Sequence, residues 1–222
     1  MKECRKYTDI MDNRQQKEKR LWDKLAGNYD SFINDMFNKT YSSVLENIDS
    51  ELNANDIVLE IGTGTGIISF SVCSKVSSIF ATDLSPEMIR IARQKQQEKN
   101  IKNIDFQIQD SYHLTFADKS FDAVIACNLL HLLYNPSKPV TEVKRVLKDN
   151  GVFIVPTFCV GENFKSRIID VIGRVFFGFR IINKWTINGF RRMLISNGLH
   201  IKKAIKIEGR FPLAYIVAEK VI

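Results

Sequence analysis

A short apolar segment that ends in three closely spaced glycines constrains the fold more than any other feature of this chain. It reads Val58-Leu-Glu-Ile-Gly-Thr-Gly-Thr-Gly66. The apolar half is typical of a buried parallel strand. The glycines allow the backbone to turn sharply and to approach a ligand without interfering Cβ atoms. The segment therefore predicts a strand, a ligand-binding turn and a helix in succession.

Strands and helices are predicted to alternate along the middle of the chain. Apolar runs predict strands at 56–61, 78–82, 104–108, 121–126 and 152–155. Helical patterns occupy 13–27, 35–48, 65–76 and 139–147, and another helix starts where Ser85 precedes Pro86 and Glu87. Asp149-Asn150-Gly151 predicts a turn. This alternation indicates right-handed βαβ units whose strand-exit loops share one edge of a parallel sheet.

The C-terminal part of the chain follows a different pattern. A helix over 185–197 closes at Gly198, and strands over 201–207 and 214–219 are separated by a linker short enough for a hairpin. We expect an α/β fold: a Rossmann-like seven-stranded sheet, mostly parallel with a C-terminal antiparallel hairpin, and helices on both faces. A nicotinamide-binding Rossmann domain does not end in such a hairpin.

Composition argues against several other classes of protein. No apolar run reaches 18 residues, and the N-terminus stays polar to about Arg20, unlike a secretory signal. The four cysteines are widely spaced, with no C-x-x-C pair and no histidine at metal-ligand spacing. We therefore expect a cytoplasmic protein with free thiols and no metal site.

The basic residues are concentrated in the last third of the chain. Residues 158–222 carry twelve Lys and Arg against four Asp and Glu, whereas 25–157 carry twelve against sixteen. A solvated surface explains this pattern, and so does a rim that attracts an anionic acceptor or a membrane surface. We expect no specific nucleic acid partner: the Asn/Asp-Pro-Pro-Tyr/Phe motif, which is typical of enzymes that act on flipped bases, is absent. A protein or a structured RNA as substrate stays open, since the basic residues of 158–222 could serve either.

Carboxylates follow two of the predicted strands and precede the glycine turn. Asp83 ends the second strand, where a carboxylate can accept hydrogen bonds from both ribose hydroxyls of an adenosine. Glu60 precedes the glycines, and the third glycine comes one residue too early for G-x-G-x-x-G. A carboxylate beside this turn is better suited to a cationic ligand than to a pyrophosphate.

Together with the terminal hairpin, these motifs make residues 50–222 resemble the class I S-adenosylmethionine (SAM)-dependent methyltransferases. The resemblance is strongest to the small-molecule group that includes the ubiquinone/menaquinone methyltransferases. It implies that SAM is the cofactor, that S-adenosylhomocysteine is its product, and that a small molecule, hydrophobic or anionic, accepts the methyl group.

The resemblance also implies which residues contact the cofactor. The turn at Gly62, Thr63, Gly64 and Gly66 would pack on the methionine and ribose, and Glu60, which precedes the turn, is also expected to contact the cofactor. Leu84 and Met88 would lie near the adenine, and Asp110 of Gln109-Asp110-Ser111 would accept a hydrogen bond from its amino group. The remaining expected cofactor contacts are Tyr29, with Trp22 beside it, Ser111 and Asn128.

The fourth motif, Phe121 to His131, would border both the sulfonium and the acceptor. His131 is the candidate general base for a hydroxyl acceptor, or else a structural residue of the loop. We expect 1–48 to form a helical cap, 49–222 the SAM-binding core and 158–184 a helical lid, in a monomer or homodimer. The alternatives are a nicotinamide-dependent oxidoreductase and a non-catalytic SAM-binding protein.

Overall fold

The computed structural model describes residues 16–17, 19–164, 166 and 181–221. The predicted lid over 158–184 therefore lies outside the described residues, except at its two ends. Within the described ranges, no helix combines the length and apolar composition that a bilayer-spanning segment requires.

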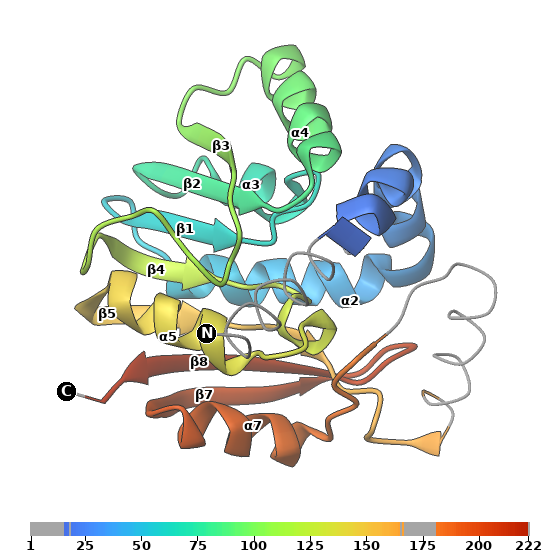
Figure 1. The fold of residues 1–222 in the computed structure, drawn as a ribbon, viewed down its shortest axis with the longest axis vertical. Helices are drawn as coiled ribbons and strands as arrows, with labels where there is room; N and C mark the ends of the chain where they lie inside the picture. Colours follow the sequence, from blue (N-terminus) through green and yellow to red (C-terminus); the bar gives the residue numbers. More distant parts are fainter. Residues whose placement is uncertain (1–15, 18, 165, 167–180, 222) are drawn as a thin grey trace, which may run out of the picture.

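One mixed sheet organises the described part of the chain (Figure 1). Its order is β3-β2-β1-β4-β5-β8, with β7 on the far side of β8 and the short β6 pairing with β8 beyond the end of β5. The first five strands are parallel, and β8 is antiparallel to its neighbours. Bounds are β1 Ile57–Ile61, β2 Ser78–Asp83, β3 Ile104–Ile108, β4 Phe121–Ile125, β5 Leu147–Ile154, β6 Thr157–Phe158, β7 Leu199–Ile207 and β8 Leu213–Lys220.

The sheet confirms the predicted fold class, with β6 as an eighth strand that the apolar pattern did not indicate. The C-terminal hairpin is the pair β7 and β8. The predicted turn at 149–151 is wrong: these residues lie inside β5. They form an irregularity there, because Phe121 pairs with Leu147 whereas Ala123 pairs with Val152. Asp149, Asn150 and Gly151 therefore form a bulge within β5 and not a turn before it.

Helices cover both faces of the sheet, as predicted. One apolar cluster joins α2, α3 and α4 to one face, and a second joins α5 and α7 to the other. The bounds are α2 Tyr29–Glu51, α3 Ile67–Val72, α4 Pro86–Glu98, α5 Ser137–Val146 and α7 Ile187–Ser196. The start of α4 has the predicted form: Ser85 Oγ accepts the Met88 N–H at 3.1 Å, and Pro86 occupies the first position.

The N-terminal helices are nearly continuous, contrary to the predicted gap between helices over 13–27 and 35–48. Residues 19–25 are helical, a 3-10 turn spans Ala26–Asn28, and α2 begins at Tyr29 rather than at 35. The apolar stripe of α2 packs in the same cluster as the parallel strands; it comprises Ile33, Phe37, Tyr41, Val44 and Ile48. Burial of this stripe extends the helix past residues with modest helix propensity.

Gly161 closes a tight junction between the chain after β6 and the chain that enters α7. Its N–H donates to the Trp185 carbonyl at 2.9 Å, and a Cβ at Gly161 would lie 2.8 Å from that same oxygen. The two backbone segments therefore approach too closely for a side chain at this position.

We predict that Gly161→Ala lowers the free energy of unfolding by about 1–3 kcal/mol, because the new methyl group forces backbone to shift. Urea denaturation would measure the effect. Gly27→Ala is the matched control, since a Cβ there meets nothing within 4 Å. Equal stability of the two variants would contradict the prediction.

Candidate functional site

The glycine turn connects β1 to α3 through three left-handed residues. Gly62, Gly64 and Gly66 have φ values of 69°, 55° and 86°, a region that residues with a Cβ adopt at a cost. A Cβ at Gly62 would also lie 2.8 Å from Leu129 Cδ1. Thr63 N–H donates to the Thr82 carbonyl at 2.9 Å, which holds the turn against the end of β2.

Glu60 supports this turn from beneath. Its carboxylate is 2% exposed and accepts hydrogen bonds from Thr63 Oγ1 at 2.7 Å, from the Ser69 N–H at 3.1 Å and from the Ser69 hydroxyl. Burial raises the pKa of Glu60 from 4.5 to about 7. Glu60 therefore braces the loop between β1 and α3 and does not itself line a cavity.

Asp83 joins the glycine turn to the start of α4. One carboxylate oxygen accepts the Gly64 N–H at 2.8 Å, and the other accepts the Ser85 N–H at 2.9 Å. Burial raises the pKa of Asp83, and these backbone hydrogen bonds oppose the rise. A single carboxylate thus positions two backbone segments at the carboxyl edge of the sheet.

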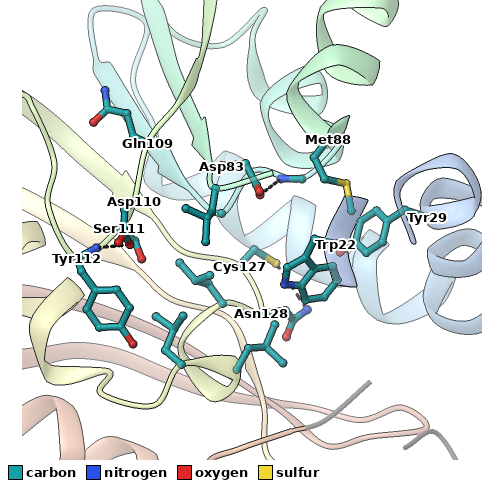
Figure 2. Close-up of a pocket in the computed structure, with 16 residues that line it drawn as sticks. Trp22, Tyr29, Asp83, Met88, Gln109, Asp110, Ser111, Tyr112, Cys127 and Asn128 are labelled. Carbon is teal, nitrogen blue, oxygen red and sulfur yellow. Dashed lines mark hydrogen bonds between the residues drawn. The ribbon is translucent and has the colours of Figure 1, made fainter. Parts of the chain in front are cut away.

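A cavity opens at this edge, where the ends of β1 to β4 meet (Figure 2). Its lining combines carboxylates with apolar and aromatic side chains, and none of the described residues that line it is Lys or Arg. The lining residues are Trp22, Tyr29, Gly62, Gly64, Asp83, Leu84, Met88, Gln109, Asp110, Ser111, Tyr112, Cys127, Asn128, Leu129, Leu132 and Leu133.

The cavity brings together most of the predicted cofactor contacts: Tyr29, Gly62, Gly64, Asp83, Leu84, Met88, Asp110, Ser111 and Asn128. Thr63 and Gly66 stay with Glu60 in the supporting layer; a Cβ at Gly66 would lie 2.9 Å from the Phe70 ring. Trp22 lines the cavity beside Tyr29, as expected, with ring centroids 6.2 Å apart.

Several lining residues were missed by sequence reasoning. Leu129, Leu132 and Leu133 belong to an apolar run, broken by His131, that follows β4 and contains the 3-10 turn Leu130–Leu132. Their spacing is equally typical of core residues, so only their proximity to Gly62 indicates a cavity wall. Cys127 lies in the fourth motif, but no pattern singles it out as a lining residue. Tyr112 follows the polar Gln109-Asp110-Ser111 and likewise has no local signal of a cavity wall.

The chain around the start of α2 is tied to the core by two carboxylates. Asp23 accepts the Ser85 hydroxyl at 2.5 Å. Asp30 accepts the Thr65 hydroxyl and pairs with Lys95 Nζ at 2.5 Å. These contacts hold Trp22 and Tyr29 over the glycine turn and the start of α4.

His131 lies apart from the cavity lining. Its side chain is buried, its Nδ1 has no hydrogen-bond partner among the described residues, and burial lowers its pKa to about 3. Its carbonyl accepts the N–H groups of Ile182 and Asn183 at 3.0 and 2.9 Å. The described geometry therefore gives no support to its predicted role as a general base.

The raised pKa of Glu60 predicts a pH-dependent stability. The folded state favours the protonated carboxyl, so the contribution of Glu60 to stability is complete below pH 4.5 and is lost as pH rises through about 7. Glu60→Gln removes this titration while keeping an acceptor for Thr63 and Ser69. The unfolding free energy of Glu60→Gln minus that of the wild type should therefore increase by about 3 kcal/mol from pH 4.5 to pH 8.

Urea titrations across this pH range would measure the difference. Glu98→Gln, at an exposed position of α4, controls for the chemistry of the substitution. A difference between Glu60→Gln and wild type that does not change with pH would refute the prediction.

Comparison with known proteins assigns this architecture to a family. The profile described as "Methyltransferase domain" matches residues 52–174, more than half of the chain. A demethylmenaquinone methyltransferase of Porphyromonas gingivalis is 35% identical over 130 residues, which cover 53% of each chain. A ubiquinone/menaquinone biosynthesis C-methyltransferase of Hydrogenovibrio crunogenus is 28% identical over 78% of this chain and 69% of its own.

Solved structures agree on the fold. YcgJ of Bacillus subtilis superposes with a TM-score of 0.70 at 20% identity, over 82% of this chain and 99% of its own. A SAM-dependent methyltransferase of Methanosarcina mazei gives 0.66 at 24% identity, over 79% and 97%. The chain spans about half the length of the Porphyromonas relative. The family match, the sheet order and the glycine turn together show that this chain belongs to the methyltransferase domain family, with the class I SAM-dependent methyltransferase fold.

Proposed function

We propose that this protein transfers a methyl group from SAM to a small-molecule acceptor. The observation that carries the proposal is the cavity at the carboxyl edge of the sheet. Its lining includes the glycine turn and the carboxylates of Asp83 and Asp110, and no Lys or Arg is among its described lining residues. Such a cavity favours a ligand with a cationic amino acid and a sulfonium over one with a pyrophosphate.

The lining residues match the parts of SAM by their chemistry. Asp83 would accept the ribose hydroxyls with the lone pairs that Gly64 and Ser85 leave unused. Asp110 would accept the adenine amino group, while Leu84 and Met88 would pack on the adenine ring. Gly62 and Gly64 allow the methionine part to approach backbone, and Tyr29, Ser111 and Asn128 would complete the contacts, with Thr63, Gly66 and Glu60 bracing the turn.

The cofactor would supply an activated methyl group on a cationic sulfur. The chain would align the acceptor with that group and exclude water, through the apolar walls at Trp22, Leu129 and Leu132. Orientation of two reactants can contribute about 7–11 kcal/mol at the limit, and a dry cavity suits a reaction that disperses charge. A base is required only when the acceptor must lose a proton.

The acceptor side of the cavity supports a hydrophobic molecule. Leu129, Leu132, Leu133 and Tyr112 form a continuous apolar wall. The Porphyromonas and Hydrogenovibrio relatives are named for quinone methylation, which is consistent with such an acceptor. Attraction of a membrane surface by the basic C-terminal part has less support, because Lys202, Lys203 and Lys206 are all paired with carboxylates.

We further propose that the helical segment up to Tyr29 is the functional part of the predicted cap. Asp23 and Asp30 hold it against α4 and the glycine turn, and Trp22 and Tyr29 contribute to the cavity. The unpaired thiols of Cys73, Cys127 and Cys159 are consistent with the reducing, cytoplasmic compartment that the sequence predicts.

The nicotinamide-dependent alternative is separable by a thermal-shift measurement. We predict that S-adenosylhomocysteine at about 100 times its Kd stabilises the protein by about 2.7 kcal/mol, whereas NAD at the same concentration has no effect. Stabilisation by NAD alone would overturn the proposal. Binding of S-adenosylhomocysteine without turnover of any acceptor in a quinone and phenol panel would favour a non-catalytic SAM-binding protein.

Removal of the Asp83 carboxylate should abolish cofactor binding. Asp83→Ala deletes the ribose acceptor and releases Gly64 and Ser85, so we expect S-adenosylhomocysteine affinity to fall by more than a hundredfold in calorimetry. Asp83→Asn keeps the side-chain shape, and we expect it to lose at least tenfold. Asp105→Asn, at an exposed position of β3, is the control; retained affinity in both Asp83 variants would refute the assignment.

A further inference from the structure

Three residues of the cavity wall converge on one buried hydroxyl group that is not part of the wall. Tyr41 of α2 is 7% exposed. Its hydroxyl accepts Asn128 Nδ2 at 3.3 Å and lies near the Tyr29 hydroxyl and the Cys127 thiol. Tyr29, Cys127 and Asn128 all line the cavity (Figure 2), whereas Tyr41 does not.

Asn128 is the most constrained of the three. Its φ of 53° is left-handed, a conformation that a residue with a side chain adopts only where its surroundings require it. Its N–H donates to the Pro156 carbonyl at 2.8 Å, and its Oδ1 accepts the Phe158 N–H at 3.1 Å. Because Oδ1 of the planar amide accepts the Phe158 N–H, the amide nitrogen of Asn128 points toward the Tyr41 hydroxyl.

The other two residues reach Tyr41 from different parts of the chain. Tyr29 begins α2 and lies in edge-to-face contact with Trp22. Cys127 and Asn128 follow β4. The Tyr41 hydroxyl therefore connects the N-terminal segment with the exit of β4, where the fourth motif borders the reacting centre in the proposed function.

A phenylalanine would fill the same volume of the apolar cluster, so packing alone does not explain a hydroxyl at this position. Tyr215 of β8 illustrates the difference. It belongs to the same apolar cluster and is fully buried, but its hydroxyl has no hydrogen-bond partner among the described residues. A buried hydroxyl is costly unless it is hydrogen-bonded, and that of Tyr41 is bonded to Asn128 in the cavity wall.

We propose that Tyr41 is a positioning residue of the cofactor cavity, whose hydroxyl orients the Asn128 amide in the cavity wall, beside Tyr29 and Cys127. This inference rests on the proposed function, because it takes the cavity to be the SAM site. It adds a residue that lies outside the cavity lining and acts through Asn128, which lines the site.

The test compares two Tyr→Phe variants in the full chain. Tyr41→Phe should weaken S-adenosylhomocysteine binding by about three- to tenfold in calorimetry, the effect of losing one hydrogen bond. Tyr215→Phe, the matched control, should bind as the wild type does. Because Tyr41 acts through Asn128, Asn128→Ala combined with Tyr41→Phe should cost less than the sum of the two single changes.

A second measurement reports on the cavity wall without any ligand. In 15N-labelled protein, the side-chain amide signal of Asn128, identified by its loss in Asn128→Ala, should shift and exchange faster with water in Tyr41→Phe. It should be unchanged in Tyr215→Phe. A merely structural role would lower the melting temperature of Tyr41→Phe without affecting either readout.

The outcomes separate the two proposals. If the wild type binds S-adenosylhomocysteine and Tyr41→Phe binds it equally well, the positioning role is overturned and the proposed function stands. If the wild type does not bind, the proposed function fails, and the role of Tyr41 in a cofactor site fails with it. An unaltered Asn128 amide signal in Tyr41→Phe would overturn the positioning role in either case.

Discussion

The arrangement of the site depends on one carboxylate at the end of a buried strand. Asp83 accepts the N–H of Gly64 with one oxygen and that of Ser85 with the other. The glycine turn after β1 and the first turn of α4 therefore keep a constant separation across the edge of the sheet. Because burial disfavours the charged carboxylate, it is retained at a cost that these backbone donors partly offset. Both segments line the cavity, so its width follows from this bridge.

A second buried carboxylate supports the same turn from the other side. Glu60 binds Thr63 and Ser69 with no charged partner among its hydrogen bonds. Together Glu60 and Asp83 make the glycine turn an acidic environment, and Asp110 adds a carboxylate across the cavity. Such a site attracts a cationic ligand and repels phosphate. The carboxylates that hold the backbone of the turn are therefore the same groups that favour a cationic ligand in the proposed function.

Several contacts that complete the cavity come from parts of the chain far apart in sequence. Tyr41 reaches Asn128 across 87 residues, and Asp23 reaches Ser85 across 62. Such pairs form only because α2 packs on the same face of the sheet as α3 and α4, which brings the N-terminal segment over the exits of β1, β2 and β4 (Figure 1). Helix packing therefore brings the N-terminal segment to the site, whereas Gly62, Gly64 and Asp83 are positioned by the ends of the strands.

The sequence by itself determined the parallel strands, the glycine turn and the residues at strand ends, because apolar runs, glycines and caps act within a few residues of one another. It therefore predicted Gly62, Gly64 and Asp83 at one edge of the sheet, and the resemblance to the family added Asp110. Only the tertiary structure decided that Glu60 supports the turn from below, that His131 is buried away from the cavity, and that Leu129, Leu132 and Tyr41 complete or support its walls. These roles depend on which face a side chain meets and what packs against it, and no local pattern contains that information.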